Sequence, residues 1–491
     1  MRQRVDMAAV ELDDEHDDPP SRPAEPQRRH RSRRWLLVPA VAAVALLGTQ
    51  LVVEARERAA VAALARVPGV VRPVDKDVEV LWTQDPGGSE LWPGLPGDGV
   101  LVGLQRTSDG SQALVAVDEL TGERRWATPL ADAHVDHAAG GLSPVGGCHP
   151  EPGGTGRVVC LVTDAYLAYR ESENVLVPSE TSRVVVADLA DGSVVAEGEA
   201  PGAVAFAALP GAVALAVPQA DGSLVVTSTD VLTGREQWQT VVPPAGDEPD
   251  EGGFVDRSTT LARAGEGIAV VTAGRRMTLL DGADGSVLSK VDAGDGFVTD
   301  SAQGTVAVFT LDDEGRVSTT LLGGGGPEIV LPGRLARVTV DDGSVPGLVL
   351  TVGSKVHAYD RSTGNDRWDV GHGLSGGVLV VRGRVYLSTP DGVVALDGST
   401  GEELWRAPVL PGRTMGDLVT DGLHVLSAQQ RPDEPGTVTA LNDWPGVGEL
   451  VAYRFDDGAE DWRVDLPGTL LGVASVGHTL MGWGSGAAVL G

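Results

Sequence analysis

Apolar and polar residues alternate along most of the chain in short runs that end at polar turns. In the string VVALDGSTGEELW, at 393–405, apolar residues are followed by Asp, a turn with Gly, and Trp. Alternate side chains of a strand point to opposite faces, and Asp with Gly is typical of tight turns, so this string predicts two antiparallel strands joined by a turn. Related strings occur at 114–126, 226–238, 356–368 and 450–462, and weaker copies without the tryptophan occur at 184–196 and 277–289.

Each marked position of the repeat has a physical role. Asp397 is suited to accept hydrogen bonds from the amides of the turn, and Gly401 to adopt a backbone conformation that a Cβ disfavours. Trp405 begins the next strand, where a large indole can pack on the neighbouring unit while its N–H finds a polar partner. The residues to which we assign these structural roles are Trp82, Asp118, Gly122, Trp126, Asp230, Gly234, Trp238, Asp360, Gly364, Trp368, Asp397, Gly401, Trp405, Gly458 and Trp462.

The spacing of the repeats predicts an all-β fold, a β-propeller of four-stranded blades. Spacings near 40 residues suit one blade. Successive turns are 70, 42, 51, 79, 37 and 57 residues apart, measured at Asp118, Asp188, Asp230, Asp281, Asp360, Asp397 and Arg454. The longest gap contains 305–333, which resembles an eroded copy whose turn has become GGGG.

The two ends of the repeat region complement each other. The segment at 78–84 resembles a last strand with its tryptophan, and the C-terminal residues resemble the strands that come before it. One blade made from both termini closes the ring and leaves no free strand edge. We therefore expect eight four-stranded blades over 76–491, with seven or nine as the alternatives.

The string A-x-D-x-x-T-G-x-x-x-W resembles the tryptophan-docking repeats of pyrroloquinoline-quinone-like β-propellers over about residues 76–491. One branch of that family contains quinoprotein alcohol dehydrogenases. The other contains non-catalytic propellers, among them the scaffold lipoprotein of the bacterial outer-membrane barrel-assembly machinery. The resemblance implies a propeller, and the residues below favour the non-catalytic branch.

The enzyme branch is known for two adjacent cysteines over the cofactor, a catalytic aspartate, and calcium held by carboxylate and amide ligands. This chain has no adjacent cysteines, and its only asparagines are Asn174, Asn365 and Asn442. The GGGG at 323–326 lacks the Lys-Ser/Thr that follows in a phosphate-binding loop. We therefore predict no catalytic residue, no bound metal and no cofactor, and assign the repeat aspartates to turns.

One segment has the properties of a membrane anchor. Five arginines lie between Arg28 and Arg34, and residues 35–53 carry no charge. Nineteen helical residues reach about 28 Å, close to the roughly 30 Å hydrocarbon core of a bilayer. The long polar prefix argues against the alternative, a cleaved signal peptide. With the arginines on the cytoplasmic side, the large domain lies outside.

These observations predict four parts of the chain. Residues 1–34 are rich in Pro and charged residues and form a disordered cytoplasmic tail. Residues 35–53 form the single transmembrane helix, 54–75 a stalk or linker, and 76–491 the extracytoplasmic propeller.

The net charge of −31 belongs to residues 54–491, because the eight acidic and eight basic residues of 1–34 cancel and 35–53 are uncharged. A surface this acidic repels nucleic acid, so we exclude nucleic-acid binding and expect cationic groups on its partners.

Cys148 and Cys160 are the only cysteines. In an oxidising compartment, two cysteines separated by a short loop with PEPGG predict a disulfide that closes a hairpin. Metal binding is the alternative, because His134, His137 and His149 lie nearby, but their spacing is irregular.

The sequence thus predicts a membrane-anchored extracytoplasmic scaffold that binds an envelope protein or glycan and performs no catalysis. The alternatives are a quinoprotein-like oxidoreductase with a degenerate cofactor site and a single-pass envelope sensor. Candidate contact surfaces are the long excursions at 132–160, 242–255 and 428–448.

Overall fold

Each strong repeat forms the third and fourth strands of a four-stranded antiparallel sheet. In the copy at 393–405, β33 (Gly392–Asp397) pairs with β34 (Glu403–Pro408), and Gly401 in the turn between them has a φ of +73°. The strands β31 (Val378–Val381) and β32 (Arg384–Thr389) precede them and complete the sheet. One such sheet is a blade.

The computed structural model divides the chain into two units, Met1–Ala60 and Val61–Gly491, and the sheets belong to the second. The described residues are 58–491 with the exception of 85–90, 95–98, 108, 133–141, 171–172, 178, 180, 245–254, 257–258, 273–275, 293–295, 301–304, 313, 324–327, 432–446, 468–469 and 485.

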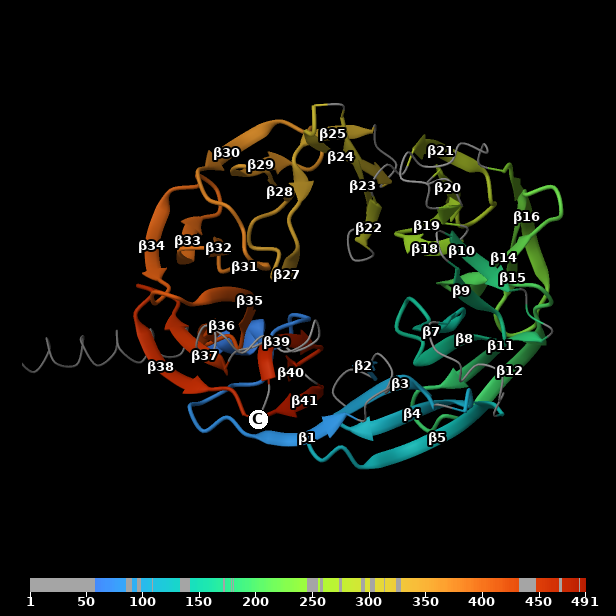
Figure 1. The fold of residues 1–491 in the computed structure, drawn as a ribbon, viewed down its shortest axis with the longest axis horizontal. Coiled ribbons are helices and arrows are strands. Elements are labelled where there is room, and N and C mark those ends of the chain that lie inside the picture. The colour runs from blue at the N-terminus through green and yellow to red at the C-terminus, as the bar shows by residue number, and fades with distance from the viewer. Residues whose placement is uncertain are drawn as a thin grey trace, which may run out of the picture. The chain divides into compact units, whose positions relative to one another are not determined.

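Nine sheets of the described residues follow one another around a ring (Figure 1). We number these blades 1 to 9 in ring order. Blade 1 contains β39 (Leu470–Val476), β40 (Thr479–Gly484), β41 (Ala487–Leu490) and β1 (Val80–Gln84); blade 2 contains β2 (Leu91–Pro93), β3 (Val100–Arg106), β4 (Gln112–Asp118) and β5 (Arg124–Ala131); blade 3 contains β7 (Gly147–Pro150), β8 (Arg157–Thr163), β11 (Ser182–Asp188) and β12 (Val194–Glu199).

Blade 4 contains β13 (Ala205–Leu209), β14 (Ala212–Pro218), β15 (Leu224–Asp230) and β16 (Glu236–Val242); blade 5 contains β18 (Thr260–Ala264), β19 (Gly267–Thr272), β20 (Arg276–Asp281) and β21 (Val287–Asp292); blade 6 contains β22 (Gly296–Asp300), β23 (Thr305–Leu311), β24 (Val317–Gly323) and β25 (Ile329–Pro332).

Blade 7 contains β26 (Arg334–Leu335), β28 (Leu348–Val352), β29 (Val356–Asp360) and β30 (Asp366–Val370); blade 8 contains β31 to β34 with β27 (Val338–Asp341) as a parallel fifth strand; blade 9 contains β35 (Thr414–Thr420), β36 (His424–Arg431), β37 (Val447–Arg454) and β38 (Glu460–Asp465).

The prediction of eight blades is wrong, because the structure has nine. The ninth is blade 6, which contains the eroded copy at 305–333. Its strands pair in the same antiparallel order as those of the strong copies, although its sequence lacks the Asp and the Trp of the repeat. Alternating apolar residues are sufficient to form a blade between two neighbours, so the turn motif undercounts the blades.

A tenth sheet of the described residues stands apart from this count. It is made of β6 (Leu142–Pro144), β9 (Tyr166–Arg170), β10 (Glu173–Val177) and β17 (Val255–Asp256). The hairpin of β9 and β10 is an insertion between β8 and β11, the second and third strands of blade 3. This insertion explains why the spacing between the turns of blades 2 and 3 is long.

The ring closes as predicted, with strands from both termini in one sheet. β1 pairs antiparallel with β41, with Trp82 opposite Val489 and Gln84 opposite Ala487. Residues before β1 add to this closure, since Val71 N donates to Thr420 O and Arg72 N donates to His478 O. The buried side chains of this segment, which falls partly within the predicted linker at 54–75, are Leu64, Val70, Val71, Val74 and Val78.

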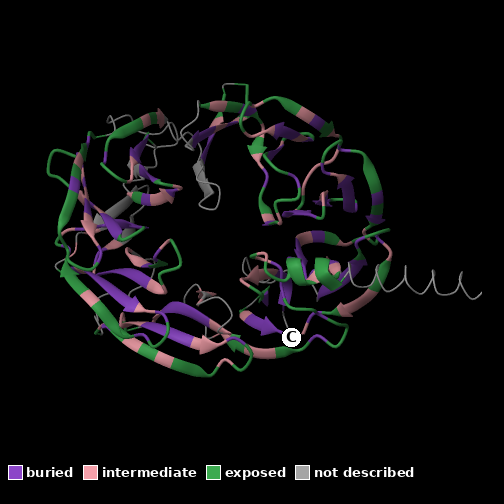
Figure 2. Cartoon of the chain, turned by 180° about the vertical axis from the view of Figure 1, so that it is seen from behind, coloured by how far each residue is buried: buried purple, intermediate pink, exposed green. Residues whose placement is uncertain are grey.

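The core lies between the faces of adjacent blades. The middle strands are buried along most of their length, while the fourth strands at the rim are largely exposed (Figure 2). Thus β33 has buried residues from Gly392 to Leu396, whereas β34 buries only Trp405 and Ala407. The tryptophan position of the repeat is therefore the place where the rim strand enters the core.

Among the described residues, no helix has the length and apolarity needed to cross a membrane. The predicted anchor at 35–53 lies outside those residues, as does the tail at 1–34.

Candidate functional site: the blade seams and the disulfide pocket

The repeat aspartates are bonded within their own turns. Asp397 Oδ1 accepts hydrogen bonds from the amides of Ser399 at 3.0 Å and Thr400 at 2.9 Å, and from the Thr400 hydroxyl at 3.1 Å. Gly401 N closes the turn by donating to Asp397 O at 2.8 Å. The same arrangement occurs at Asp118, Asp230 and Asp360.

These bonds keep the aspartates ionised. The Arg125 guanidinium and then the Thr121 amide lower the pKa of Asp118 to about 2. The Ser362 hydroxyl, followed by Arg367, holds the pKa of Asp360 well below its ordinary value. A general acid or base needs a pKa near the working pH, so aspartates held this way are suited to turns and not to proton transfer.

The repeat glycines receive the tryptophan of the preceding blade. A Cβ placed on Gly401 would lie 2.8 Å from Trp368 Cγ, and one on Gly458 would lie 2.3 Å from Trp405 Cε3. The tryptophan stands eight residues after the Asp of one blade and meets the glycine four residues after the Asp of the next. The other pairs of this kind are Trp82 with Gly122, Trp126 with Gly192 and Trp238 with Gly285.

Four of these tryptophans also donate an indole N–H across their seams. Trp405 Nε1 donates to Phe455 O at 2.8 Å, and Trp368 Nε1 donates to Gly398 O at 3.0 Å. Trp82 Nε1 and Trp238 Nε1 make the equivalent bonds to Glu119 O and Gly282 O. In every case the acceptor is the carbonyl one residue after the Asp position, so the tryptophan packs on the turn and is also hydrogen-bonded to it.

Four seams depart from this rule, and at one of them Ser289 occupies the tryptophan position of blade 5. Ala196 occupies the tryptophan position of blade 3, and a Cβ on Gly234 of blade 4 would meet nothing within 4 Å. In blade 6, Ile329 replaces the indole and packs on Gly364, whose Cβ would lie 2.8 Å from Ile329 Cγ2. Trp462 of blade 9 meets a blade whose third and fourth strands, β41 and β1, are not consecutive in the chain. It packs beside the cluster that contains Val71, Val74 and Val78.

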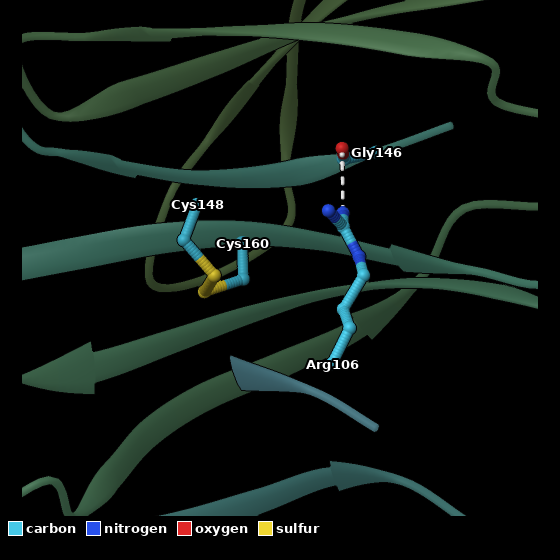
Figure 3. Close-up of a disulfide and its surroundings, with 4 residues drawn as sticks. All are labelled: Arg106, Gly146, Cys148 and Cys160. Carbon is cyan, nitrogen blue, oxygen red and sulfur yellow. Dashed lines mark hydrogen bonds between the residues drawn. A yellow bond between two sulfur atoms is a disulfide. The ribbon is translucent and has the colours of Figure 1, made fainter. Parts of the chain in front are cut away.

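The disulfide is present, between Cys148 of β7 and Cys160 of β8. The two residues are directly opposite each other in the register of these strands, so the bridge joins the first two strands of blade 3 (Figure 3). Beside it, Arg106 of β3 reaches across the seam from blade 2, and its Nη2 donates to Gly146 O at 3.1 Å. Both cysteines are buried.

A cavity of about 440 Å³ adjoins the disulfide. It brings together parts of blades 1, 2 and 3, and Trp92 Nε1, one of its polar atoms, has no hydrogen-bond partner among the described residues. The lining is mostly apolar and contains no carboxylate, which suits contact with an apolar group. Its residues are Gln84, Leu91, Trp92, Cys148, His149, Pro150, Val476 and Met481.

The sequence did not predict this cavity, since Trp92 and Met481 lie outside any repeat position. The metal alternative involved three histidines, of which His134 and His137 lie outside the described residues. His149 packs its ring on Phe206, with the ring centroids 5.1 Å apart. Within the described part of the chain, no group of three or more His, Cys, Asp or Glu side chains is placed to hold a metal ion.

The family model described as outer membrane protein assembly factor BamB matches residues 110–317 and 352–490, more than half of the chain. No curated protein sequence matches the chain. Among solved structures, BamB from Moraxella catarrhalis is 13% identical, with a TM-score of 0.37, and the alignment covers 83% of this chain and 99% of that chain.

Two further solved structures are similar at the same level. The computationally designed Ika8 protein is 14% identical, with a TM-score of 0.38 and coverage of 84% of this chain and 99% of that chain. The quinohemoprotein alcohol dehydrogenase ADHIIG from Pseudomonas putida HK5 is 13% identical, with a TM-score of 0.32 and coverage of 77% of each chain.

The predicted resemblance to pyrroloquinoline-quinone-like propellers is confirmed by the family match and by the repeated turns. The chain belongs to the propeller family described as outer membrane protein assembly factor BamB.

Proposed function

We propose that the chain is a non-catalytic, protein-binding scaffold of the cell envelope. The observation that carries the proposal is membership of a family described as an outer membrane protein assembly factor. A factor of that kind acts by contact with other envelope proteins, and a rigid ring with loops on both faces is suited to such contact.

The geometry of the repeat supports a role without catalysis. The most recognisable polar residues, the turn aspartates, are bonded to the amides and hydroxyls of their own turns. The tryptophans are hydrogen-bonded at the seams and pack on glycines. These residues stabilise the blades and the seams between them. We infer that partners bind to other surfaces of the propeller.

The anchor belongs to the same proposal. The uncharged segment at 35–53 crosses the cytoplasmic membrane, the tail at 1–34 lies in the cytoplasm, and the propeller lies outside. The five arginines before the segment support this orientation through the positive-inside rule. A propeller fixed to the membrane by one helix samples only the partners that come within reach of its tether.

The test is cross-linking of the full chain in its own envelope, followed by purification and identification of the attached proteins. A second membrane-anchored protein with an unrelated outer domain serves as the matched bait. We expect envelope proteins to be enriched with the propeller over this bait. No enrichment over the bait would contradict the scaffold proposal.

The oxidoreductase alternative has its own test. The purified full chain, supplied with pyrroloquinoline quinone and calcium, is expected to neither bind the quinone saturably nor reduce a dye with alcohols or sugars as donors. Saturable quinone binding together with substrate-dependent dye reduction would replace the scaffold proposal, because the cofactor supplies the redox chemistry in such enzymes.

A further inference from the structure

The seam between blades 3 and 4 has the turn that receives a tryptophan at other seams, but it has no tryptophan. The blade 4 turn is complete, because Asp230 Oδ1 accepts hydrogen bonds from the Thr233 amide and the Thr233 hydroxyl, each at 2.8 Å. Gly234 N closes the turn by donating to Asp230 O at 2.9 Å. A Cβ on Gly234 would nevertheless meet nothing within 4 Å, because Ala196 stands at the tryptophan position of β12.

This seam also has the backbone acceptor for an indole N–H. At the hydrogen-bonded seams the acceptor is the carbonyl one residue after the Asp, and here that residue is Val231. Val231 N donates to Gly211 O at 3.1 Å, and the residue that binds Trp368 donates to a glycine carbonyl in the same way. In the described part of the chain, no donor is hydrogen-bonded to Val231 O. We name Ala196, Val231 and Gly234 the open seam.

The side chain opposite Ala196 does not take the place of an indole. That side chain is Val186 of β11, which is buried. A valine at this position is compatible with an indole, because Val489 is directly opposite Trp82, which packs on Gly122. The open seam therefore differs from an occupied seam by the absence of the indole.

The residues of β12 around Ala196 leave the open seam accessible. Gly198 stands two residues later, where two occupied seams have a threonine that reaches the next turn, and a Cβ on Gly198 would meet nothing within 4 Å. Val194 and Val195, immediately before Ala196, are both exposed. An apolar group that enters the open seam would therefore find apolar surface beside it.

We propose that the open seam binds a tryptophan side chain of a protein partner. The proposal rests on the scaffold function and names the chemistry of one contact. The occupied seams show that a turn of this kind binds an indole, with a glycine under the ring and a carbonyl for the N–H. Glu197 and Glu199 of β12 are exposed and the chain has a net charge of −31, so basic residues beside the partner's tryptophan favour binding.

The experiment measures binding of a fluorescently labelled peptide to the purified full chain in a neutral detergent. The peptide has one tryptophan flanked by lysines, and the matched peptide has leucine in its place. The main variant is Ala196→Trp, which supplies the indole from blade 3 itself. Its control is Val195→Trp, which adds an indole at the position where Leu404 of blade 8 is exposed. A second variant, Gly234→Ala, places a Cβ where the indole of the peptide would lie.

We expect the tryptophan peptide to bind about tenfold more tightly than the leucine peptide, because only the indole can pack on Gly234 and donate to Val231 O. Ala196→Trp and Gly234→Ala each weaken binding of the tryptophan peptide by at least about tenfold, because each fills the space that the indole needs. Val195→Trp weakens it by less than about twofold. Circular dichroism shows whether each variant is folded.

Equal binding of the two peptides overturns the proposal, as does tryptophan binding that folded Ala196→Trp or Gly234→Ala leaves unchanged. If Ala196→Trp does not fold, Gly234→Ala decides. In the cross-linking experiment, partners retained by Ala196→Trp leave the scaffold standing and remove this contact. An unmodified chain without partners removes the scaffold, and the peptide assay then decides the site alone.

Discussion

At the scale of single residues, the repeat glycines have two different reasons to be glycine. All of them adopt a positive φ, which side chains disfavour, as at +67° for Gly458 and +66° for Gly234. Gly458 also lies under the indole of Trp405, whereas Gly234 faces open space because Ala196 stands at the preceding tryptophan position. Substitutions at Gly458 and Gly234 can therefore distinguish two effects on stability, that of the backbone conformation and that of contact with the indole.

Gly458→Ala is expected to destabilise the propeller more than Gly234→Ala. Both lose about 1–2 kcal/mol from the left-handed conformation. Gly458→Ala is expected to lower the free energy of unfolding by about 1–3 kcal/mol more, because its Cβ would lie 2.3 Å from Trp405 Cε3. The two blades would have to move apart to make room for it. Denaturant unfolding of the two variants measures the difference. Equal losses would show that the indole does not constrain the turn.

The indole itself can be tested from the other side of the seam. Trp405 is 8% exposed and donates to Phe455 O, so Trp405→Ala is expected to lower the free energy of unfolding by about 3–5 kcal/mol. Trp483, which is 39% exposed, is the matched control, and Trp483→Ala is expected to cost less than about 1.5 kcal/mol. Thermal or denaturant unfolding gives both values, and similar losses would count against docking at the seam.

At the scale of elements, the closure of the ring depends on a segment that is not itself a strand. Val74 N donates to Asp421 Oδ2, and His424 Nδ1 lies 3.2 Å from the same oxygen. His424 Nε2 lies 3.3 Å from Asp461 Oδ2 in β38, so the imidazole links the turn that holds the segment to the rim strand. The Trp462 ring packs against the imidazole in a T-shaped arrangement.

This histidine predicts a pH dependence of stability. The hydrogen bond to Asp421 raises the pKa of His424 above 6.5, against the effect of burial. Since the folded-state pKa is the higher one, the stabilisation is complete below the unfolded pKa, about 6.5, and is lost as the pH rises through the folded-state pKa. Unfolding measured from pH 6 upward should show this loss, and His424→Gln should remove it. If the free energy of unfolding of His424→Gln changed with pH as it does in the unmodified chain, another group would be responsible for the pH dependence.

The disulfide hairpin is a second element whose contribution can be measured. A bridge that closes a loop of this length stabilises by about 3 kcal/mol through the entropy of the unfolded chain. In the double variant Cys148→Ala and Cys160→Ala, the free energy of unfolding measured with denaturant should fall by that amount. Reduction of the unmodified chain should lower its free energy of unfolding equally. Thiols that react with an alkylating reagent before reduction would contradict the bridge.

At the scale of the whole molecule, nine blades follow one another with no need for nine identical seams. Among the described residues, five seams have a tryptophan on a glycine and one uses Ile329. The sequence of blade 6 lacks the Asp and the Trp of the repeat. Each blade is held by hydrogen bonds within its sheet and by apolar contact on both faces. A ring closed by both termini therefore tolerates weak copies between strong ones.

The membrane anchor is a prediction for the whole chain. The full chain should stay in the membrane fraction after washing with concentrated salt. Replacing Leu46 and Leu47 by Asp should release it or prevent insertion, because each charge at the middle of a membrane helix costs about 2.5–3.5 kcal/mol. Leu46→Val is the matched control. Recovery of an intact soluble form that begins near residue 54 would show a cleaved signal peptide.

How much the sequence predicts depends on how local the information is. One contiguous string contains the turn residues Asp397 and Gly401, the alternating apolar residues and Trp405. They therefore predicted the strands, the propeller and the joining of its ends. The two cysteines and the short loop between them predicted the disulfide hairpin. The blade count was wrong because blade 6 keeps the alternation and has lost the turn residues that mark a copy.

By itself, the sequence determined that this chain is an all-β repeat ring of the pyrroloquinoline-quinone-like kind, because period and turn residues act over short distances along the backbone. Only the tertiary structure decided which glycine lies under an indole, since Trp405 and Gly458 come from different blades. It also decided that Gly234 faces open space, since Ala196 of blade 3 stands across that seam. Contacts between residues far apart in the chain depend on strand register and ring closure, which no single string of residues encodes.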